Sequence, residues 1–530
     1  LLRASRAYQS NVSERLAGQV LGALYELVRG AQAARSARAG DPIAALVTPT
    51  DPDPETARAG KEALYQGLLT VVMRLLFQLY AEERGLAFDD GAPTGDYAIA
   101  PLYERLREDA ALHPDTMDHR YGAWAQLLAL WRLTYEGCPD LGAMPRHGSL
   151  FDPGRFPFLE GRRADTDPIT VPLIPDGTIY RVLEQLLVLD GERLSYRALD
   201  VEHIGSVYEA MMGFRIEVAS GTSVAIRGQG ALGAPVTIAL EDLLAQAPAA
   251  RGAWLEKAAG RAPTGAALAA LRAARTIDEA HGALERLIDR RATPDRVPAG
   301  ALVMQPSDER RSSGSHYTPR SLTEPIVKRT LDPQRDRLRP APGVAPTPGA
   351  ILGLAVCDPA MGSGAFLVET CRYLGDALVA AWHAHGGRPT GAGRHDEVVH
   401  ARRLVAQRCI YGVDRNRMAV ELAKVSVWLA TLARDLPLTF IDHALRHGDS
   451  LVGLTRAQVL ALDWDATSTQ LSWMRDRSRE AFERLATARR RVREAGVEVP
   501  RATLEGWWAE ADDALAEVRL YGDLVVMAFF

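Results

Sequence analysis

Lysine and asparagine are scarce in this chain of 530 residues. Only four of its 62 basic residues are lysines, and its two asparagines are Asn11 and Asn416. The lysines are Lys61, Lys257, Lys328 and Lys424. None of them stands two residues after an acid, which excludes the D/E-x-K site of a metal-dependent nuclease within these residues. The shortage of asparagine excludes an H-N-H nuclease, and no G-x-x-x-x-G-K-[ST] stretch provides a P-loop for ATP.

Cysteine, long apolar runs and net positive charge are lacking as well. The four cysteines form no C-x-x-C pair and show no zinc-ligand spacing, so we expect no metal site and a reducing, cytoplasmic location. The longest apolar helical stretch, residues 68–80, is interrupted by Arg74 and Gln78, which predicts a core helix and no membrane association. The net charge of −5 means that any affinity for nucleic acid depends on local basic patches or on other parts of the protein.

The most informative segment is Asp358-Pro-Ala-Met-Gly-Ser-Gly-Ala-Phe366. It follows the apolar run from Ile351 to Cys357, for which we predict a strand. A strand that ends in a carboxylate, turns through two glycines and opens a helix is typical of a nucleotide-type cofactor site, because glycine permits close backbone approach. There is no G-x-G-x-x-G sequence, and an acid leads the turn. The pattern therefore favours a cofactor with a cationic group over one that presents a pyrophosphate.

Three further segments stand in a suggestive order around this turn. Gly314-Ser-His-Tyr-Thr-Pro319 precedes a predicted helix, Cys409-Ile-Tyr-Gly-Val-Asp414 is a short predicted strand ending in an acid, and His447-Gly-Asp-Ser-Leu451 follows. Each segment taken alone is equally well explained as a helix start, a helix N-cap or a turn. Their common order within about 135 residues, from 314 to 449, favours one shared cofactor site.

In this order the segments resemble motifs X, I, II and III of S-adenosylmethionine (SAM) dependent methyltransferases, in the form found in DNA adenine-N6 enzymes. The resemblance implies that Thr318 and Pro319 lie near the methionine end of SAM, with Asp358 and the backbone of Gly362–Gly364 beside it. It places Asp414 at the ribose and Asp449 at the adenine of SAM. The complete set of residues that it assigns to SAM is His316, Tyr317, Thr318, Pro319, Asp358, Pro359, Ala360, Met361, Gly362, Ser363, Gly364, Phe366, Asp414, Arg415, Asp449 and Ser450.

The resemblance also implies a domain organisation. We expect an α/β Rossmann-like SAM-dependent methyltransferase domain at residues 301–460, containing only the N-terminal half of its sheet. A mostly α-helical N-terminal region (1–190) and a mostly helical middle region (191–300) precede it. Apolar residues at helical spacing predict helices at 13–29 and 57–84 within the first region. Residues 461–530 are predicted to form a helical hairpin insertion that leads to a missing catalytic strand.

Amino-methyltransferases of this type carry a fourth motif, Asn/Asp/Ser-Pro-Pro-aromatic, which holds the target amino group and stacks on the flipped base. This chain contains no Pro-Pro dipeptide, so no catalytic residue is assigned in it. It begins without methionine and ends on the apolar stretch from Leu524 to Phe530. We therefore expect a longer polypeptide, or a partner chain, to supply the catalytic motif and the rest of the sheet.

The resemblance implies a SAM-dependent DNA adenine-N6 methyltransferase of a bacterial restriction-modification or phage-defence system, with the DISARM kind favoured because no nuclease is visible. Its expected partners are double-stranded DNA and other defence-system subunits. Residues 57–84 and 201–211 resemble the helical region of type IIG restriction-modification proteins, so a fused endonuclease-methyltransferase is one alternative. A non-catalytic SAM-binding scaffold or sensor subunit is another, and a methyltransferase acting on protein or RNA is a third.

Overall fold

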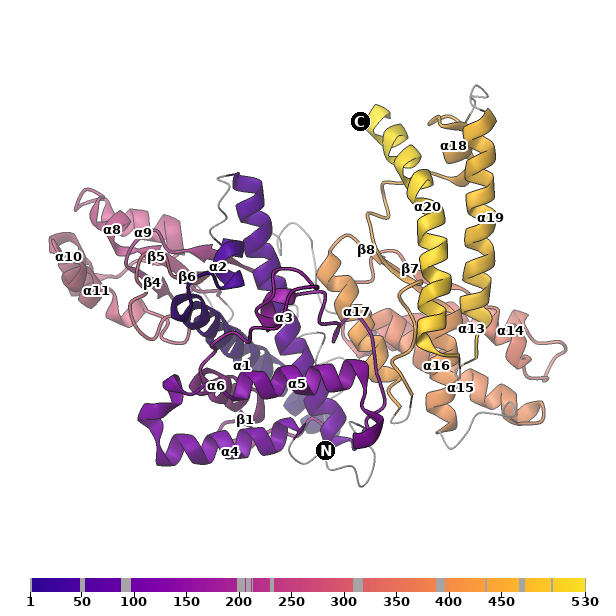
Figure 1. The fold of residues 1–530 in the computed structure, drawn as a ribbon, viewed down its shortest axis with the longest axis horizontal. Helices are drawn as coiled ribbons and strands as arrows, with labels where there is room; N and C mark the ends of the chain where they lie inside the picture. The colour runs from indigo at the N-terminus through magenta and orange to yellow at the C-terminus, as the bar shows by residue number, and fades with distance from the viewer. Residues whose placement is uncertain are drawn as a thin grey trace. The chain divides into compact units, whose positions relative to one another are not determined.

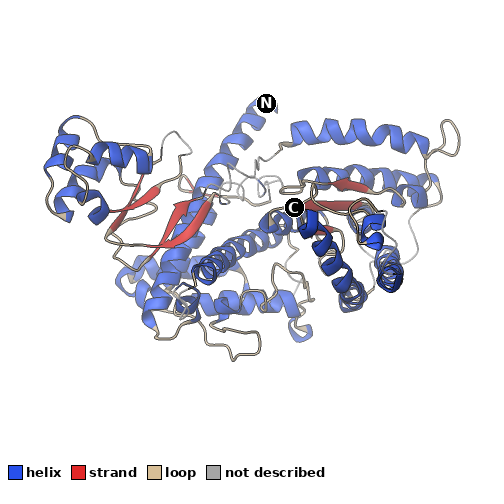
Figure 2. Ribbon diagram, turned by 90° about the horizontal axis from the view of Figure 1, so that it is seen from above, coloured by secondary structure: helices blue, strands red, loops and turns tan. Residues whose placement is uncertain are grey.

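The computed structural model describes residues 2–47, 53–86, 97–197, 205, 211, 213–228, 233–307, 318–387, 396–433, 436–466, 472–496 and 499–529. These residues are mostly helical, and their strands form small sheets (Figures 1 and 2). The chain divides into two compact units. The first comprises Leu1–Tyr135, Leu150–Leu199 and Ser206–Ser315, and the second comprises Glu136–Ser149, Asp200–Gly205 and His316–Phe530. Two residues assigned to SAM, His316 and Tyr317, lie outside the described residues, as does most of the stretch 201–211.

The N-terminal part of the first unit is helical. Its helices are α1 (Leu2–Ala37), α2 (Pro42–Val47), α3 (Pro54–Glu83), α4 (Ile99–Leu112), α5 (Ala123–Glu136) and α6 (Asp176–Leu187), with 3-10 turns η2 (Pro114–His119) and η4 (Pro157–Glu160). Helix α3 agrees closely with the helix predicted at 57–84, whereas α1 extends well beyond the predicted 13–29.

Helix α3 has sequence-encoded ends. The Asp53 side chain accepts hydrogen bonds from the backbone N–H groups of Glu55 and Thr56, and Pro54 occupies the first turn. Gly85, at φ 65°, donates to the Glu82 carbonyl while Leu86 donates to the Ala81 carbonyl, which is the Schellman arrangement of helix C-termini. By length and composition α3 could cross a membrane, but 89% of its most apolar window is buried within the protein. That burial is what a core helix of a folded unit requires.

One charged residue lies in the middle of this buried helix. Arg74 donates from Nε to the Leu150 carbonyl (2.7 Å) and from Nη2 to the Asp152 carbonyl (3.1 Å), and its guanidinium lies 5.1 Å from the centre of the Trp131 ring. Burial lowers the pKa of Arg74 to about 10, so the side chain is cationic at neutral pH. The carbonyl partners and the ring compensate for its desolvation, and they tie the segment after Leu150 to the core.

The rest of the first unit, in which residues 191–300 were predicted to be mostly helical, contains short strands as well as helices. A short hairpin, β1 (Val188–Leu189) and β2 (Glu192–Arg193), precedes two antiparallel pairs: β3 (Phe214–Val218) with β6 (Leu302–Pro306), and β4 (Ser223–Ile226) with β5 (Val236–Ala239). Helices α8 (Leu240–Leu244), α9 (Arg251–Ala259), α10 (Gly265–Ala273) and α11 (Ile277–Leu284) and the turn η5 (Glu285–Leu287) follow β5. Strands β3, β4 and β5 are only four or five residues long and rich in β-branched residues, so helical periodicity could not reveal them.

A three-stranded parallel sheet organises the second unit. Strands β7 (Val356–Asp358), β8 (Ile410–Asp414) and β9 (Leu445–His447) lie in the order β7-β8-β9, with Asp358 opposite Gly412 and Asp414 opposite His447. Helices α15 (Ala365–Ala384) and α16 (Glu397–Arg408) connect β7 to β8, and α17 (Arg417–Ala430) leads on toward β9. Helices α13 (Arg320–Arg337) and α14 (Pro348–Leu352) precede β7.

The strand predicted from Ile351 to Cys357 is correct only at its last two residues, Val356 and Cys357. Ile351 and Leu352 belong to α14, and β7 begins at Val356. The reason is local: the Thr347 hydroxyl accepts a hydrogen bond from the Ala350 N–H, and Pro348 follows at the first helical position. These two capping signals outweigh the apolar run, which by itself is compatible with either structure.

Helices α18 (Arg456–Ala461), α19 (Ser472–Glu494) and α20 (Arg501–Phe529) complete the second unit. As predicted, α19 and α20 form an antiparallel hairpin, and they lie side by side in Figure 1. Val492 of α19 packs with Leu504 of α20 near the connection, and Ala481 packs with Val518 farther along. The apolar residues from Leu524 to Phe529 continue α20 as helix.

A short stretch from the N-terminal half of the sequence packs within the second unit. Residues 136–149, which include the turn η3 (Pro139–Leu141), belong to the second unit. Arg146 donates to the carbonyls of Ala433 and Leu436, and Ser149 donates to the Glu421 carboxylate of α17 (2.9 Å). Gly148, at φ 90°, adopts a left-handed backbone conformation that favours glycine, and a Cβ there would lie 3.0 Å from a Leu438 methyl group. We call this stretch the strap.

A charged cluster joins the base of the hairpin to α17. Asp442 accepts from Lys424 of α17 (2.8 Å) and from Arg501 at the start of α20 (2.9 Å). The side chains of Lys424 and Arg501 are only 10% and 4% exposed. Burial alone raises the pKa of Asp442, but the two cations outweigh burial and lower that pKa to about 2. The neighbouring His443 stacks on Phe440, and burial lowers the pKa of its imidazole to about 4, so it is neutral at pH 7.

We predict that Asp442→Ala destabilises the second unit by about 2–3 kcal/mol at pH 7, because it removes the carboxylate that two buried cations share, leaving Lys424 with the longer 3.4 Å contact to Glu421 and Arg501 with Glu505. Hydrogen exchange of β9 and the base of α20, measured by mass spectrometry, reports this local free energy. The matched control is Asp512→Ala, which removes a carboxylate paired with Arg446 and Arg519 at half-exposed positions and should cost less than about 1 kcal/mol. Equal protection in the two variants would contradict the role of Asp442.

Candidate functional site

The carboxyl ends of the three parallel strands bring the central sequence motifs together. Asp358 ends β7, Asp414 ends β8, and Gly448 and Asp449 directly follow β9. Parallel strands place their carboxyl ends at one edge of a sheet, which is where open α/β sheets bind ligands. The three acids predicted from the sequence therefore share one edge.

The turn after β7 is shaped by its two glycines. Gly362 (φ 51°) and Gly364 (φ 80°) both adopt left-handed backbone conformations, and Gly364 is the N-cap of α15. A Cβ at Gly364 would lie 3.0 Å from Cβ of Ala423, so the turn also needs glycine to approach α17. Between them, Ser363 is buried. The turn is thus held tightly against the protein, with the N-terminus of α15 opening from it.

Strand β8 also holds this turn. The Met361 N–H donates to the Val413 carbonyl (3.0 Å), and the Met361 side chain is 4% exposed. It packs directly over Gly412, where a Cβ would meet Met361 Sδ at 2.3 Å. Glycine in the middle of β8 therefore makes room for the methionine of the turn.

Asp414 connects the first two motifs through its carboxylate. Its Oδ2 accepts from the Gly362 N–H (2.9 Å), and its Oδ1 accepts from the Asn416 N–H (2.8 Å). A carboxylate can accept about four hydrogen bonds, so both oxygens keep capacity for a ligand's hydroxyl groups. Asp414 both orders the glycine turn and remains able to bind a ligand beside it.

The third motif is hydrogen-bonded to the second. Gly448 donates to the Asp414 carbonyl (3.0 Å), and a ring nitrogen of His447 lies 2.9 Å from the Arg415 carbonyl. Asp449 Oδ1 accepts from the Leu451 N–H (2.9 Å), and its Oδ2 lies 3.9 Å from Nε of the largely exposed Arg415. Asp449 and the exposed Ser450 therefore belong to one short turn beside Asp414.

The carboxyl group of Asp358 is held in a less polar setting than a surface acid. Burial raises the pKa of Asp358, and the nearby negative charge of Asp414 adds to this effect, while a hydrogen bond from the Ala360 N–H (3.1 Å) opposes it. A cationic group placed between Asp358 and Asp414 would offset both the burial of the Asp358 carboxylate and its repulsion by Asp414. The site is electrostatically suited to a ligand with a positive charge on one end.

Motif X enters this unit through α13. Pro319 is the N-cap of that helix, and Thr318 is half-buried just before it. Arg320, in the first turn, lies 3.3 Å from the buried carboxylate of Glu369 in α15, and Tyr373 of α15 donates to Asp332 of α13. These contacts hold α13 against the helix that opens from the glycine turn. The remaining assigned residues, Pro359, Ala360 and Phe366, belong to that turn and to the first turn of α15.

Two residues outside the predicted set support the site. The Asn416 side chain caps α17 by accepting from the N–H groups of Met418 and Ala419, and Glu369 pairs with both Arg320 and Arg372. The role of Asn416 could have been predicted from the sequence, because an asparagine directly before an apolar helical pattern is a typical N-cap. Glu369 carried none, since its role depends on the packing of α13 on α15.

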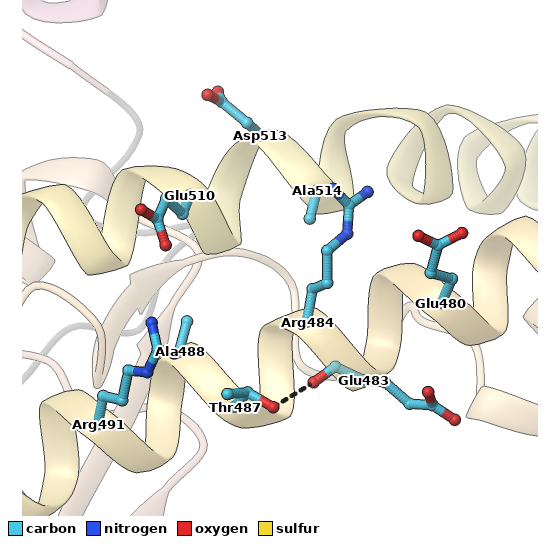
Figure 3. Close-up of a pocket in the computed structure, with 9 residues that line it drawn as sticks. All are labelled: Glu480, Glu483, Arg484, Thr487, Ala488, Arg491, Glu510, Asp513 and Ala514. Carbon is cyan, nitrogen blue, oxygen red and sulfur yellow. Dashed lines mark hydrogen bonds between the residues drawn. The ribbon is translucent and has the colours of Figure 1, made fainter.

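A groove of about 630 Å³ lies elsewhere in the unit, between α19 and α20 (Figure 3). Its lining includes four acids, Glu480, Glu483, Glu510 and Asp513, against the two cations Arg484 and Arg491. Within the residues that the structure describes, no group of three or more His, Cys, Asp or Glu side chains is arranged to hold a metal ion. The groove is lined by residues of α19 and α20 and does not include the ends of the parallel strands.

The family model described as N-6 DNA Methylase matches residues 301–452. Residues 301–452 are similar to N-6 DNA methylases. The match covers less than a third of the chain, from β6 to just beyond β9, and includes all four motifs. No curated protein matches the chain. We refer to residues 301–452 as the methylase-like segment.

The geometry of the methylase-like segment defines what it can bind. It offers a carboxylate for a cation at Asp358, hydrogen-bond acceptors for hydroxyl groups at Asp414, and an acceptor for an amino group at Asp449. The glycine turn and the N-terminus of α15 come between Asp358 and Asp414. Members of the N-6 DNA methylase family normally use SAM, and the sulfonium-bearing amino acid, ribose and adenine of SAM present those groups in that order. The residues present fit this cofactor.

We predict that Gly364→Ala destabilises the methylase-like segment by about 2 kcal/mol or more, because it combines an unfavourable φ with a clash against Ala423. Gly362→Ala is the matched control: its φ is also positive, but a Cβ there meets nothing within 4 Å, so only the conformational cost of about 1 kcal/mol applies. Thermal unfolding of the two variants measures the difference. Equal melting temperatures would show that close approach of the turn to α17 is unimportant.

Proposed function

We propose that this protein is a SAM-dependent DNA methyltransferase that modifies the N6 amino group of adenine. The observation that carries the proposal is the placement of Asp358, the Gly362–Gly364 turn, Asp414 and Asp449 at one sheet edge, where Gly362 and Gly448 both donate to Asp414, within a segment similar to N-6 DNA methylases. We further propose that the three parallel strands are part of a Rossmann-like methyltransferase sheet, and that the protein acts in the cytoplasm.

In this proposal each acid has a separate task. Asp358 pairs with the amino group of the methionine end of SAM, Asp414 accepts from the ribose hydroxyls, and Asp449 accepts from the adenine amino group, with Thr318 and Pro319 near the methionine end. Holding the sulfonium methyl in a fixed position is the protein's main contribution, because oriented binding removes most of the entropic cost of the transfer. Bound SAM would supply the methyl group for the exocyclic nitrogen of a flipped adenine, with S-adenosylhomocysteine as the leaving group and loss of one proton from that nitrogen.

The biological setting proposed is bacterial restriction-modification or phage defence, in which methylation marks host DNA. A system of the DISARM kind is favoured by the lack of D/E-x-K, H-N-H and P-loop sequences in these 530 residues. The lack of an Asn/Asp/Ser-Pro-Pro-aromatic motif in the same residues favours a second candidate, a SAM-binding subunit that senses SAM or supports a defence complex. The two candidates differ in whether a methyl group reaches DNA.

We predict that Asp414→Ala weakens SAM binding at least about tenfold, because it removes hydrogen bonds to a charged acceptor. Isothermal titration calorimetry gives the affinity. Asp376→Ala, which removes a largely exposed acid on α15, is the matched control and should bind SAM normally.

Because Asp414 also orders the glycine turn, a second ligand separates its two roles. S-adenosylhomocysteine and its 2′-deoxy analogue should lose different amounts of affinity in Asp414→Ala, with the smaller loss for the analogue. Equal losses would assign Asp414 to the turn alone, and unchanged SAM affinity would remove it from the site altogether.

The decisive test of the function uses the native, full-length gene product, methyl-labelled SAM and unmodified duplex DNA, followed by digestion to nucleosides. We expect label in N6-methyladenine. Label in RNA or protein would instead identify a different acceptor. Tight SAM binding with no transfer to any of the three would favour the sensor or scaffold candidate.

A further inference from the structure

A basic pocket of about 470 Å³ opens in the part of the first unit that mixes strands and helices. Four arginines contribute to its lining, together with one acid and two glycines. The lining residues are Arg227, Gly228, Gly233, Arg261, Asp289, Arg290 and Arg291. We call it the arginine pocket. It lies outside the segment that matches N-6 DNA methylases.

The arginine pocket is built on a hydrogen-bonded frame. Arg227 directly follows β4, and its N–H donates to the Leu287 carbonyl (2.8 Å). Asp289 donates in turn to the Ala225 carbonyl (2.8 Å), so the stretch after η5 runs beside β4 like an additional strand. Arg261 follows Gly260, the left-handed C-cap of α9. The ends of β4, α9 and η5 therefore bring together arginines that are far apart in the sequence.

Asp289 organises this frame from inside. It is 7% exposed, and its Oδ1 accepts from the N–H groups of Arg291 (3.0 Å) and Ala292 (3.3 Å). Arg29 of α1 donates to the carbonyls of the same two residues. The backbone at Arg291 and Ala292 is thus held on both sides, while the side chains of Arg290 and Arg291 are exposed. A fixed backbone beneath exposed guanidinium groups is the arrangement of a binding site rather than of a loose surface loop.

The charge of the pocket is not neutralised from within. Arg291 lies 3.5 Å from Asp289, and Arg290 pairs with Glu285. Arg227 and Arg261 form no ion pair with any residue that the structure describes. Four guanidinium groups against two carboxylates leave a net charge of +2. By contrast, the groove between α19 and α20 has four acids and two arginines, a net charge of −2 (Figure 3).

The two glycines contribute backbone to the lining of the pocket. A Cβ on Gly228 would lie 2.4 Å from the Gly233 carbonyl carbon, so the two backbones meet closely there. Arginine is the residue that best matches the oxygen atoms of a phosphate, because its planar group offers two parallel N–H donors. A concave surface of guanidinium groups and exposed backbone is therefore suited to a phosphate group.

We propose that the arginine pocket binds the phosphodiester backbone of DNA and gives the protein a sequence-independent contact outside its methylase-like segment. Since the whole chain has a net charge of −5, affinity for DNA must come from local basic sites such as this one. The inference rests on the proposed function, which makes DNA the substrate. It extends that function by assigning part of the DNA contact to the first unit.

The test measures binding of the full chain to a fluorescent duplex by anisotropy, at a series of salt concentrations. Arg227→Gln combined with Arg261→Gln should lower affinity about tenfold near 0.1 M salt, and should reduce the slope of log affinity against log salt by about one to two. The matched control is Lys257→Gln combined with Arg272→Gln, which removes two exposed positive charges from α9 and α10 outside the pocket lining. The control pair should change neither quantity appreciably.

Two outcomes overturn the proposal. If the pocket pair and the control pair bind DNA alike, the pocket is not a DNA contact. If pyrophosphate at submillimolar concentration shifts the melting temperature of the wild type but not of the pocket pair, while DNA affinity is equal in both, the pocket serves a small phosphate compound instead. Circular dichroism of both pairs verifies folding, and Arg227→Glu with Arg261→Glu should weaken DNA binding further.

The methyl-transfer assay separates this inference from the proposed function. Wild-type protein that labels adenine while the pocket pair binds DNA normally would preserve the function and refute the pocket. DNA binding that depends on the pocket, without label in any nucleoside, would support the pocket and refute methylation. Absence of DNA binding by the wild type at low salt would overturn the pocket inference directly.

Discussion

The hydrogen bond from the Gly362 N–H to the Asp414 carboxylate is the interaction on which the candidate site depends. It joins a turn after the first parallel strand to the end of the second, across 52 residues of sequence. The same carboxylate orders the N-terminus of α17 through Asn416, and the Asp414 carbonyl accepts from Gly448 after the third strand. One residue therefore positions all three strand-end motifs, and the left-handed glycines are necessary because the turn must reach it.

The remainder of the second unit supports this edge from a distance. The strap binds the Glu421 carboxylate of α17 and the carbonyls of Ala433 and Leu436 beyond its end. Asp442 connects α17 to the base of the α19–α20 hairpin. Buried ion pairs of this kind contribute little net stability but penalise any arrangement that separates their members. The cluster thus favours one orientation of the hairpin relative to the sheet. A stretch from the first third of the chain is consequently part of the folding unit that carries the methylase-like segment.

Charge is distributed unevenly over the described residues, and this distribution bears on partners more than the net value does. The α19–α20 groove is acidic, whereas the arginine pocket has a net positive charge on a rigid frame. Arginine supplies 58 of the 62 basic residues, the four others being lysines, and its planar guanidinium can serve either role seen here. Buried Arg74 and Arg146 bind backbone carbonyls within the protein, while exposed Arg227 and half-buried Arg261 line the pocket proposed to take an external anion.

The amino-acid sequence by itself determined the motifs and their order, the helix over 54–83, the α19–α20 hairpin and the strand ending at Asp414, because glycine turns, caps and long helical periodicity are local signals. It did not separate α14 from β7, since a short apolar run fits either a helix or a strand until its cap is considered. Only the tertiary structure decided that Asp414 binds the glycine turn, that residues 136–149 pack beside α17, and that four arginines line one pocket. Those contacts join residues distant in sequence, and no local pattern records them.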